Sequence, residues 1–196
     1  MEAPVALRAR KAVMWTREDC RKIAGAGLLP ARWELVQGEI ISKMGTNLPH
    51  SMIAQRIFTW LSSVFPADCI LPTCSIDVAP EDNPTSEPEP DITILNRPAA
   101  QLGRNPGPGD ILLIVEVSDT TLDHDLGPKA RLYARAGIQE YWVVDIKGRR
   151  IHQHREPNSE GYTSVLVIET GGVLSPLTRQ DATLTPGVIF GSLNIG

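Results

Sequence analysis

The sequence predicts an α/β fold, a central mixed β-sheet flanked by α-helices, within a single domain that spans residues 1–196. Residues 111–117 form an apolar, β-branched run, which is typical of a strand buried on both faces. A helical segment follows, and then a second strand at residues 140–146. Strand, helix and strand within about 36 residues make a βαβ unit, whose two strands run parallel.

Glu116 interrupts the first of these two strands. An ionised carboxylate in a buried strand is costly unless it is paired, hydrogen-bonded or bound to a metal, so we expect function to explain it. The following helix is predicted to begin near Pro128 and to end at Gly137. Because such crossovers are right-handed, Glu116 and Lys129 are expected to face one cleft.

Before this unit, the sequence predicts a helix over residues 16–25 that begins with a capping box. Residues 33–42 alternate around a Gln-Gly pair, which indicates a hairpin or a bulged strand pair. Apolar residues then recur at helical spacing from His50 until Pro66 stops the helix.

A loop rich in proline and acidic residues, residues 80–90, is expected to be mobile at its tip. The other predicted elements are strands at 70–78 and 91–95, an additional hairpin of 150–156 with 162–168, and a loosely extended tail at 184–195.

Composition is that of an ordinary globular protein, with 42% hydrophobic and 21% charged residues. No apolar run approaches the roughly 18 residues of a membrane span, so no membrane contact is expected. The basic N-terminus lacks a following apolar segment, and the chain has only three cysteines. These observations predict a cytoplasmic protein without a disulfide framework.

The net charge of −4 argues against a protein that coats nucleic acid, since phosphate affinity comes mainly from clustered lysine and arginine. Charge is nevertheless uneven. Basic side chains, among them Arg8, Arg10 and Lys11, gather in residues 1–33, and acidic ones gather in residues 77–91. This pattern is compatible with an enzyme that cuts a polyanion with a metal, and equally with solvated faces.

Two carboxylates suggest a metal site. Asp91 enters one predicted strand and Glu116 lies near the end of the next. If adjacent strands hold both side chains on one side of the sheet, their oxygens converge as a hard divalent ion requires, and the natural ion is Mg²⁺ or Mn²⁺. A soft-metal site is not expected, because Cys69 and Cys74 have no matching pair and His152 and His154 are interpreted as exposed histidines.

Several stretches of the chain, in order, resemble the Uma2 family (DUF820), a branch of the PD-(D/E)XK nuclease superfamily. They are residues 33–40 (WELVQGEI), His50, 90–92 (PDI), 115–118 (VEVS), the Asp125-x-Gly-x-Lys129-x-x-x-Tyr133 pattern and 136–145 (AGIQEYWVVD). The resemblance implies a restriction endonuclease-like core and an endonuclease that acts on DNA.

By this resemblance, Asp91 and Glu116 bind Mg²⁺. Lys129 replaces the lysine that the superfamily motif would place at position 118, where this chain has Ser118. Glu34 matches an additional acid that related nucleases contribute from their N-terminal part, and would orient the water or a second ion. Relatives often carry Glu where this chain has a proline at position 128.

Structural roles remain open for several residues. Asp91 can cap a turn after Pro90, and Glu116 can form a structural ion pair with Lys129. His50 can be a helix-terminal residue without a role. The remaining candidates are assigned to the core, the cleft wall or a strand end: Tyr133, Tyr141, Trp142 and Asp145.

Two other functions compete with the nuclease. A catalytically inactive DNA-binding or assembly module is favoured by the acidic pI of about 5.6 and by the lack of a recognition motif. A metal-dependent hydrolase of another phosphate ester is the second. A homodimer is compatible with the sequence, which does not specify the oligomeric state.

Overall fold

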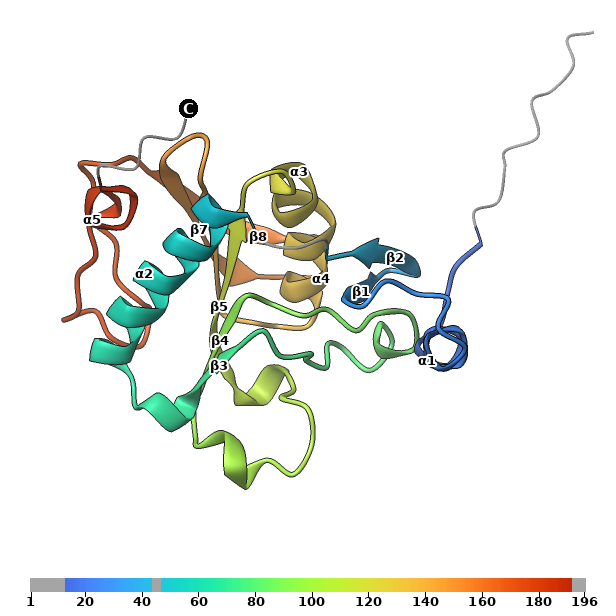
Figure 1. The fold of residues 1–196 in the computed structure, drawn as a ribbon. Coiled ribbons are helices and arrows are strands. Elements are labelled where there is room, and N and C mark those ends of the chain that lie inside the picture. Colours follow the sequence, from blue (N-terminus) through green and yellow to red (C-terminus); the bar gives the residue numbers. More distant parts are fainter. Residues whose placement is uncertain (1–12, 44–46, 192–196) are drawn as a thin grey trace, which may run out of the picture.

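The computed structural model describes residues 13–43 and 47–191. Within those residues, a six-stranded mixed sheet lies between two layers of helices (Figure 1). The strands, in spatial order, are β3 (Ile70–Pro72), β4 (Ile92–Leu95), β5 (Ile111–Ser118), β6 (Glu140–Asp145), β7 (Arg150–Pro157) and β8 (Tyr162–Ile168). The predicted α/β class with a central mixed sheet is confirmed.

Helices cover both faces of the sheet (Figure 1). On one face lie α2 (Leu48–Val64) and α5 (Pro186–Phe190), and on the other lie α3 (Leu122–His124) and α4 (Ala130–Arg135). Short 3₁₀ turns connect the elements at Ala67–Cys69, Asn83–Thr85, Ala99–Gln101 and Pro108–Asp110.

Strand β5 occupies the middle of the sheet, antiparallel to β4 and parallel to β6, so the predicted βαβ unit is confirmed. Its side chains alternate between the two faces. Val115 and Val117 pack with α2, whereas Ile114 packs in the cluster beneath α4. Glu116 therefore points toward α4.

The helix after β5 begins earlier than predicted. It starts at Leu122 and passes through a π-helical turn, Asp125–Lys129, before α4. The expected start near Pro128 is wrong, because Pro128 lies inside this turn. Proline lacks the N–H for a regular helical hydrogen bond, and a widened π turn accommodates that loss.

The end of this helix is as predicted. The Ile138 N–H donates to the Tyr133 carbonyl at 3.1 Å, and the Gly137 N–H donates to the Ala134 carbonyl at 2.8 Å. With Gly137 at φ +76°, this is a Schellman motif, which glycine forms without steric strain.

The N-terminal predictions are also confirmed. Helix α1 (Arg17–Gly25) begins with a capping box between Thr16 and Asp19. The hairpin consists of β1 (Trp33–Val36) and β2 (Glu39–Ser42), joined by two residues with positive φ, as tight hairpin turns require. Helix α2 begins two residues before His50, with Asn47 as its N-cap.

The segment between β3 and β4 differs from the predictions. Strand β3 ends at Pro72 rather than extending to residue 78, and Thr73 has φ +48°. The proline-rich loop is tied down: Arg135 makes two hydrogen bonds of 3.0 Å to the Asp82 carboxylate. Strand β1 and the loop are also joined by hydrogen bonds between the Leu35 and Glu87 backbones. These contacts contradict the expected mobile tip.

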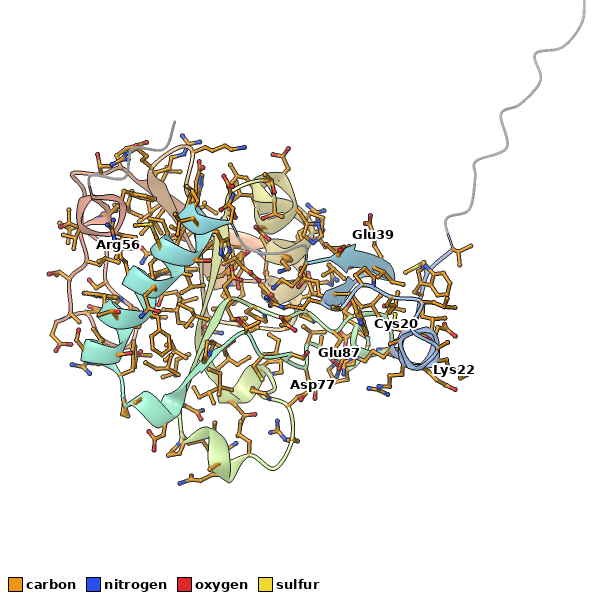
Figure 2. All side chains as sticks on the ribbon, viewed as in Figure 1. Cys20, Lys22, Glu39, Arg56, Asp77 and Glu87 are labelled. Carbon is orange, nitrogen blue, oxygen red and sulfur yellow. The ribbon has the colours of Figure 1, made fainter. Side chains whose placement is uncertain are left out.

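Helix α1 packs against the same loop at its 3₁₀ turn, Asn83–Thr85. Glu87 of the loop and Asp77, which precedes the loop, lie beside the helix (Figure 2). Arg17 Nη1 lies 2.7 Å from Asp77 Oδ1, and Arg17 Nε donates to the Ser86 carbonyl at 2.6 Å. The loop therefore links the N-terminal helix to the hairpin.

The β7–β8 hairpin is confirmed, and it buries His152 and His154, so the expectation that these histidines are exposed is wrong. The three cysteines, all within the described ranges, are free thiols. The tail contains α5 rather than an extended chain. Residues 192–195 of the tail and the basic residues Arg8, Arg10 and Lys11 lie outside the described residues. In the described part, no helix has the length and apolar character to span a membrane.

Candidate active site

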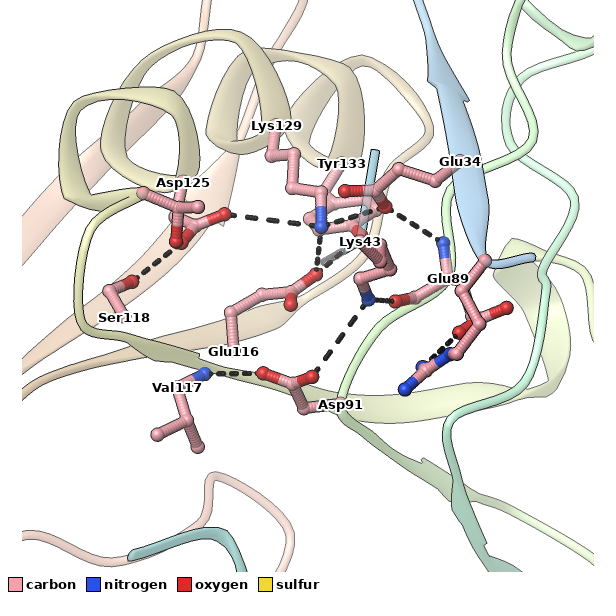
Figure 3. Close-up of polar contacts among 12 residues, drawn as sticks. Glu34, Lys43, Glu89, Asp91, Glu116, Val117, Ser118, Asp125, Lys129 and Tyr133 are labelled. Atoms are coloured by element: carbon pink, nitrogen blue, oxygen red, sulfur yellow. Dashed lines mark hydrogen bonds and ion pairs between the residues drawn. The ribbon is translucent and has the colours of Figure 1, made fainter. Parts of the chain in front are cut away.

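Asp91, the residue directly before β4, lies opposite Glu116 on β5 (Figure 3). Ile92 pairs with Val115, so one step along the same antiparallel ladder sets Asp91 against Glu116. Directly opposed residues point to the same side of a sheet, which places both carboxylates toward α4. The Val117 N–H donates to Asp91 Oδ2 at 2.8 Å and fixes that side chain.

Lys129 joins this pair from the helix that follows β5. Its Nζ lies 2.7 Å from Glu116 Oε1 and 2.9 Å from Glu34 Oε2, and its side chain is only 2% exposed. Asp125 Oδ1 lies 3.9 Å from the same Nζ. The structure thus brings the four residues that the sequence nominates, Asp91, Glu116, Lys129 and Glu34, to the lining of one pocket (Figure 3). Glu116, Glu34 and Asp125 surround the Lys129 ammonium, whereas Asp91 contacts Lys43 and His50.

Backbone and hydroxyl groups hold the acids in place. Glu34, on β1, accepts a hydrogen bond of 3.1 Å from the Glu89 N–H. Asp125 Oδ2 accepts hydrogen bonds of 2.6 Å from the hydroxyls of Ser118 and Thr121. The hairpin, the end of β5 and the π-helical turn therefore each fix one wall of the site.

Sequence reasoning missed Lys43, which lies between Asp91 and the loop. Its Nζ is 3.8 Å from Asp91 Oδ1 and donates to the Glu89 carbonyl. A signal was present: Ile41 pairs with Glu34 in the hairpin, and Lys43, two residues further, lies on the same face.

Two further contacts were only partly foreseen. His50 Nε2 lies 3.3 Å from Asp91 Oδ2, so His50 reaches the site. The Tyr133 hydroxyl donates to Glu116 Oε1 at 3.1 Å, and this buried tyrosine is both a core residue and a site residue. The sequence places Tyr133 on the face of Lys129 but does not indicate that its hydroxyl meets Glu116.

Electrostatics show that the site carries an excess of negative charge. Burial raises the pKa of Glu116 to about 8, and the charges of Asp91 and Asp125 act in the same direction against the attraction of Lys129. Burial would raise the pKa of Glu34 as well, but Lys129 and Lys43 outweigh it and lower that pKa. Glu116 is therefore the acid that takes up a proton near neutral pH.

The pKa of Lys129 favours its charged form, in contrast to that of Glu116. Burial alone would lower its pKa, but the carboxylates of Glu116, Glu34 and Asp125 outweigh burial and raise that pKa well above the usual value. For Asp91, the hydrogen bond from His50 and the charge of Lys43 outweigh burial and lower the pKa. In the absence of other ions, Lys129 is an ammonium and Asp91 a carboxylate.

The donor set fits a hard divalent ion better than a soft one. Mg²⁺ is commonly held by one or two carboxylates and keeps several waters, and Asp91 and Glu116 supply two carboxylates. Across residues 13–43 and 47–191, no group of three or more His, Cys, Asp or Glu side chains is arranged to hold a metal ion. A cation here would also relieve the charge that raises the pKa of Glu116.

These residues line a hollow of about 200 Å³ that opens to solvent, which we call the acidic hollow. Its buried lining residues are Glu34, Glu116, Asp125 and Lys129. The partly or fully exposed residues around them, which we call the rim, include Arg32, Lys43, Asn47, His50, Asp91 and Asp119. The basic and polar groups on the rim can meet an anionic substrate.

Other nominated residues are structural. Asp145 accepts hydrogen bonds from the Gly148 N–H at 2.8 Å and from Arg150 Nε at 3.0 Å, and thereby shapes the β6–β7 turn. Trp142 is buried in the core, and Tyr141 donates its hydroxyl to the Asp125 carbonyl at 3.0 Å. The expectation of core or cleft-wall positions holds for these aromatic residues.

Comparisons with known proteins agree with this fold. No curated protein matches the chain. Among solved structures, it is similar to a crystal structure described as a putative nuclease belonging to DUF820 from Anabaena variabilis, with a TM-score of 0.64 and 17% sequence identity. That similarity covers 89% of this chain and 97% of the other, and shows a shared fold. Residues 28–186 match the family Uma2, described as "Putative restriction endonuclease". The chain therefore belongs to the Uma2 family.

Proposed function

We propose that this protein is a Mg²⁺-dependent endonuclease that hydrolyses phosphodiester bonds in DNA. One observation carries the proposal: Asp91, one residue before β4, lies opposite Glu116 on β5, and the Lys129 ammonium lies 2.7 Å from Glu116. Membership of a family described as "Putative restriction endonuclease" and the nuclease-like fold support the same reaction class. Mn²⁺ is expected to substitute for Mg²⁺, because both prefer oxygen ligands.

Asp91 and Glu116 would hold the ion. When bound, Mg²⁺ supplies Lewis-acid chemistry, which neutralises charge on a phosphate and lowers the pKa of water. Tyr133 donates its hydroxyl to Glu116 and fixes the position of that carboxylate. The backbone N–H of Val117 does the same for Asp91.

Lys129 would stabilise the negative charge that develops on the phosphate oxygens. The sequence permits either this function or that of a general base. The raised pKa of Lys129 favours the first, because a group that stays protonated cannot accept a proton from water. Glu34 would position the ammonium, since its Oε2 lies 2.9 Å from Nζ.

Metal binding is the first testable consequence. Calorimetry should show Mg²⁺ and Mn²⁺ uptake by the wild type, with affinity lowered by at least about tenfold in both Asp91→Asn and Glu116→Gln, since even partners of metal ligands contribute that much. Asp181→Asn is the matched control, because Asp181 is 73% exposed and pairs with Arg179. Equal uptake by all four proteins would show that the assigned site is wrong.

Cleavage itself is tested with plasmid and single-stranded DNA in Mg²⁺ and in Mn²⁺. From the wild type we expect nicked or linear plasmid and shortened single strands, and from Asp91→Asn neither. If the wild type cleaves neither substrate with either ion, the binding or assembly module becomes the better explanation of the fold.

A further inference from the structure

A second hollow of about 230 Å³, which we call the side hollow, adjoins the acidic hollow. It lies between α2 and the ends of β3 and β4. The two hollows share three lining residues, Arg32, His50 and Asp91. A substrate whose phosphate lies at Asp91 would therefore have its adjoining nucleoside at the side hollow.

The lining of the side hollow differs from that of the acidic hollow. Apart from the shared residues, it consists of Ser51, Ala54, Gln55 and Phe58 from α2 and of Pro72, Thr73 and Ile92 from the strand side. Phe58 is half-buried, with part of its side chain packed against the core. One aromatic ring, aliphatic walls, an amide and hydroxyl groups match a flat ligand that has apolar faces and polar edges, as a nucleobase has.

The backbone at the wall of the side hollow is strained. Thr73 has φ +48°, a conformation that β-branched residues rarely adopt, and its N–H donates to the Asp91 carbonyl at 3.0 Å. Such strain persists where surrounding contacts enforce it, and it is concentrated at ligand sites. The hydrogen bond joins this wall directly to Asp91, one of the three residues that both hollows share.

We propose that the side hollow receives the unpaired base of the nucleotide next to the phosphate that is cleaved. This inference rests on the proposed nuclease function. In a duplex, each base is stacked and paired and would have to leave the helix to enter the hollow. The protein should therefore prefer single-stranded DNA over duplex DNA of the same sequence.

The test measures binding without cleavage, with Ca²⁺ as an oxygen-binding cation in place of Mg²⁺. The probes are a fluorescent single strand of about 12 nucleotides, within the range that single-strand binding domains cover, and its duplex. We expect the wild type to bind the single strand more tightly. Phe58→Ala should weaken single-strand binding by about 5- to 150-fold, the size of one base–aromatic stack, and duplex binding by less than about twofold.

Two further variants separate recognition from folding. Phe58→Leu keeps aliphatic packing but loses the ring, and Gln55→Ala changes an exposed position that cannot disturb the core. Both should weaken single-strand binding. Trp60→Ala is the matched control, because Trp60 is also a half-buried aromatic residue of α2 but stacks on Trp142 and does not line the side hollow.

Equal affinity of the wild type for single strand and duplex would overturn the inference. So would losses at Phe58 that Trp60→Ala reproduces, or that are the same for both probes. The proposed function fails differently, through the absence of any metal-dependent cleavage by the wild type. Metal-dependent cleavage without a preference for single-stranded DNA would therefore support the proposed nuclease function and overturn only the base-binding site.

Discussion

Lys129→Met is expected to reduce DNA cleavage by roughly 10²- to 10⁴-fold, the range for loss of a group that stabilises charge in the transition state. Lys129 lies within 3 Å of both Glu116 and Glu34, and its raised pKa keeps it positively charged. Methionine has a similar length but no charge. The measurement compares initial rates of plasmid and single-strand cleavage in Mn²⁺ at equal concentrations of folded protein.

Folding must be measured in parallel, because methionine leaves the buried carboxylates of Glu34 and Glu116 without their shared ammonium. Lys129→Arg retains the charge but replaces a compact ammonium with a planar guanidinium, so it should restore little cleavage. Lys147→Met makes the same chemical change at an exposed lysine and should cleave as the wild type does. Undiminished cleavage by folded Lys129→Met would remove Lys129 from the mechanism.

Glu116→Gln is expected to stabilise the protein in EDTA above pH 6. The folded-state pKa of Glu116 is raised from 4.5 to about 8. Stability from this group is thus fully present below about pH 4.5 and is lost as the pH rises toward 8. At pH 7 the free energy of unfolding is lower by roughly 3 kcal/mol than it would be with Glu116 at its usual pKa, at 1.36 kcal/mol per pKa unit. Glutamine cannot ionise and therefore avoids this cost, so the variant should melt roughly 5–10 °C above the wild type.

Glu34→Gln provides a control of opposite sign. Glu34 contacts the same ammonium, but its pKa is lowered, so its charged form stabilises the fold at neutral pH and this stability is lost as the pH falls through the lowered pKa. Its glutamine variant should therefore melt below the wild type at pH 7 in EDTA. A lower melting temperature for Glu116→Gln as well would identify Glu116 as a structural partner of Lys129 rather than a residue retained for function.

The central part of the fold is predictable because its signals are local. Apolar runs mark β5 and β6, and Gly137 marks the end of the intervening helix. Glu116 is recognisable as a candidate because it is a charged residue inside the first apolar run. Its approach to Lys129 follows from the right-handed crossover, which is a general property of parallel strands.

Other features depend on contacts between distant segments. Pro128 normally marks the start of a helix, and its place inside a π-helical turn depends on the whole segment after β5. Lys43 reaches Asp91 only because the hairpin packs beside β4. His154 lies on a strand whose alternating pattern predicts one exposed face. In the folded chain, however, Tyr141 and Tyr162 cover His154.

The order of the proline-rich loop also depends on contacts between distant segments. Its composition is typical of mobile segments, and nothing local in the sequence indicates that Arg135 bonds to Asp82 or that Leu35 pairs with Glu87. These contacts also position the Glu89 N–H that fixes Glu34. A loop that its composition predicts to be mobile therefore forms part of the wall of the site.

A metal ion between two opposed carboxylates is the central claim, and anomalous scattering from crystals soaked in Mn²⁺ tests it most directly. We expect an anomalous peak between Asp91 and Glu116, within the 2.0–2.6 Å that hard cations keep from oxygen ligands, and no such peak in Asp91→Asn. A soaked crystal with no peak at this position, or with Mn²⁺ bound only elsewhere, would contradict the assignment.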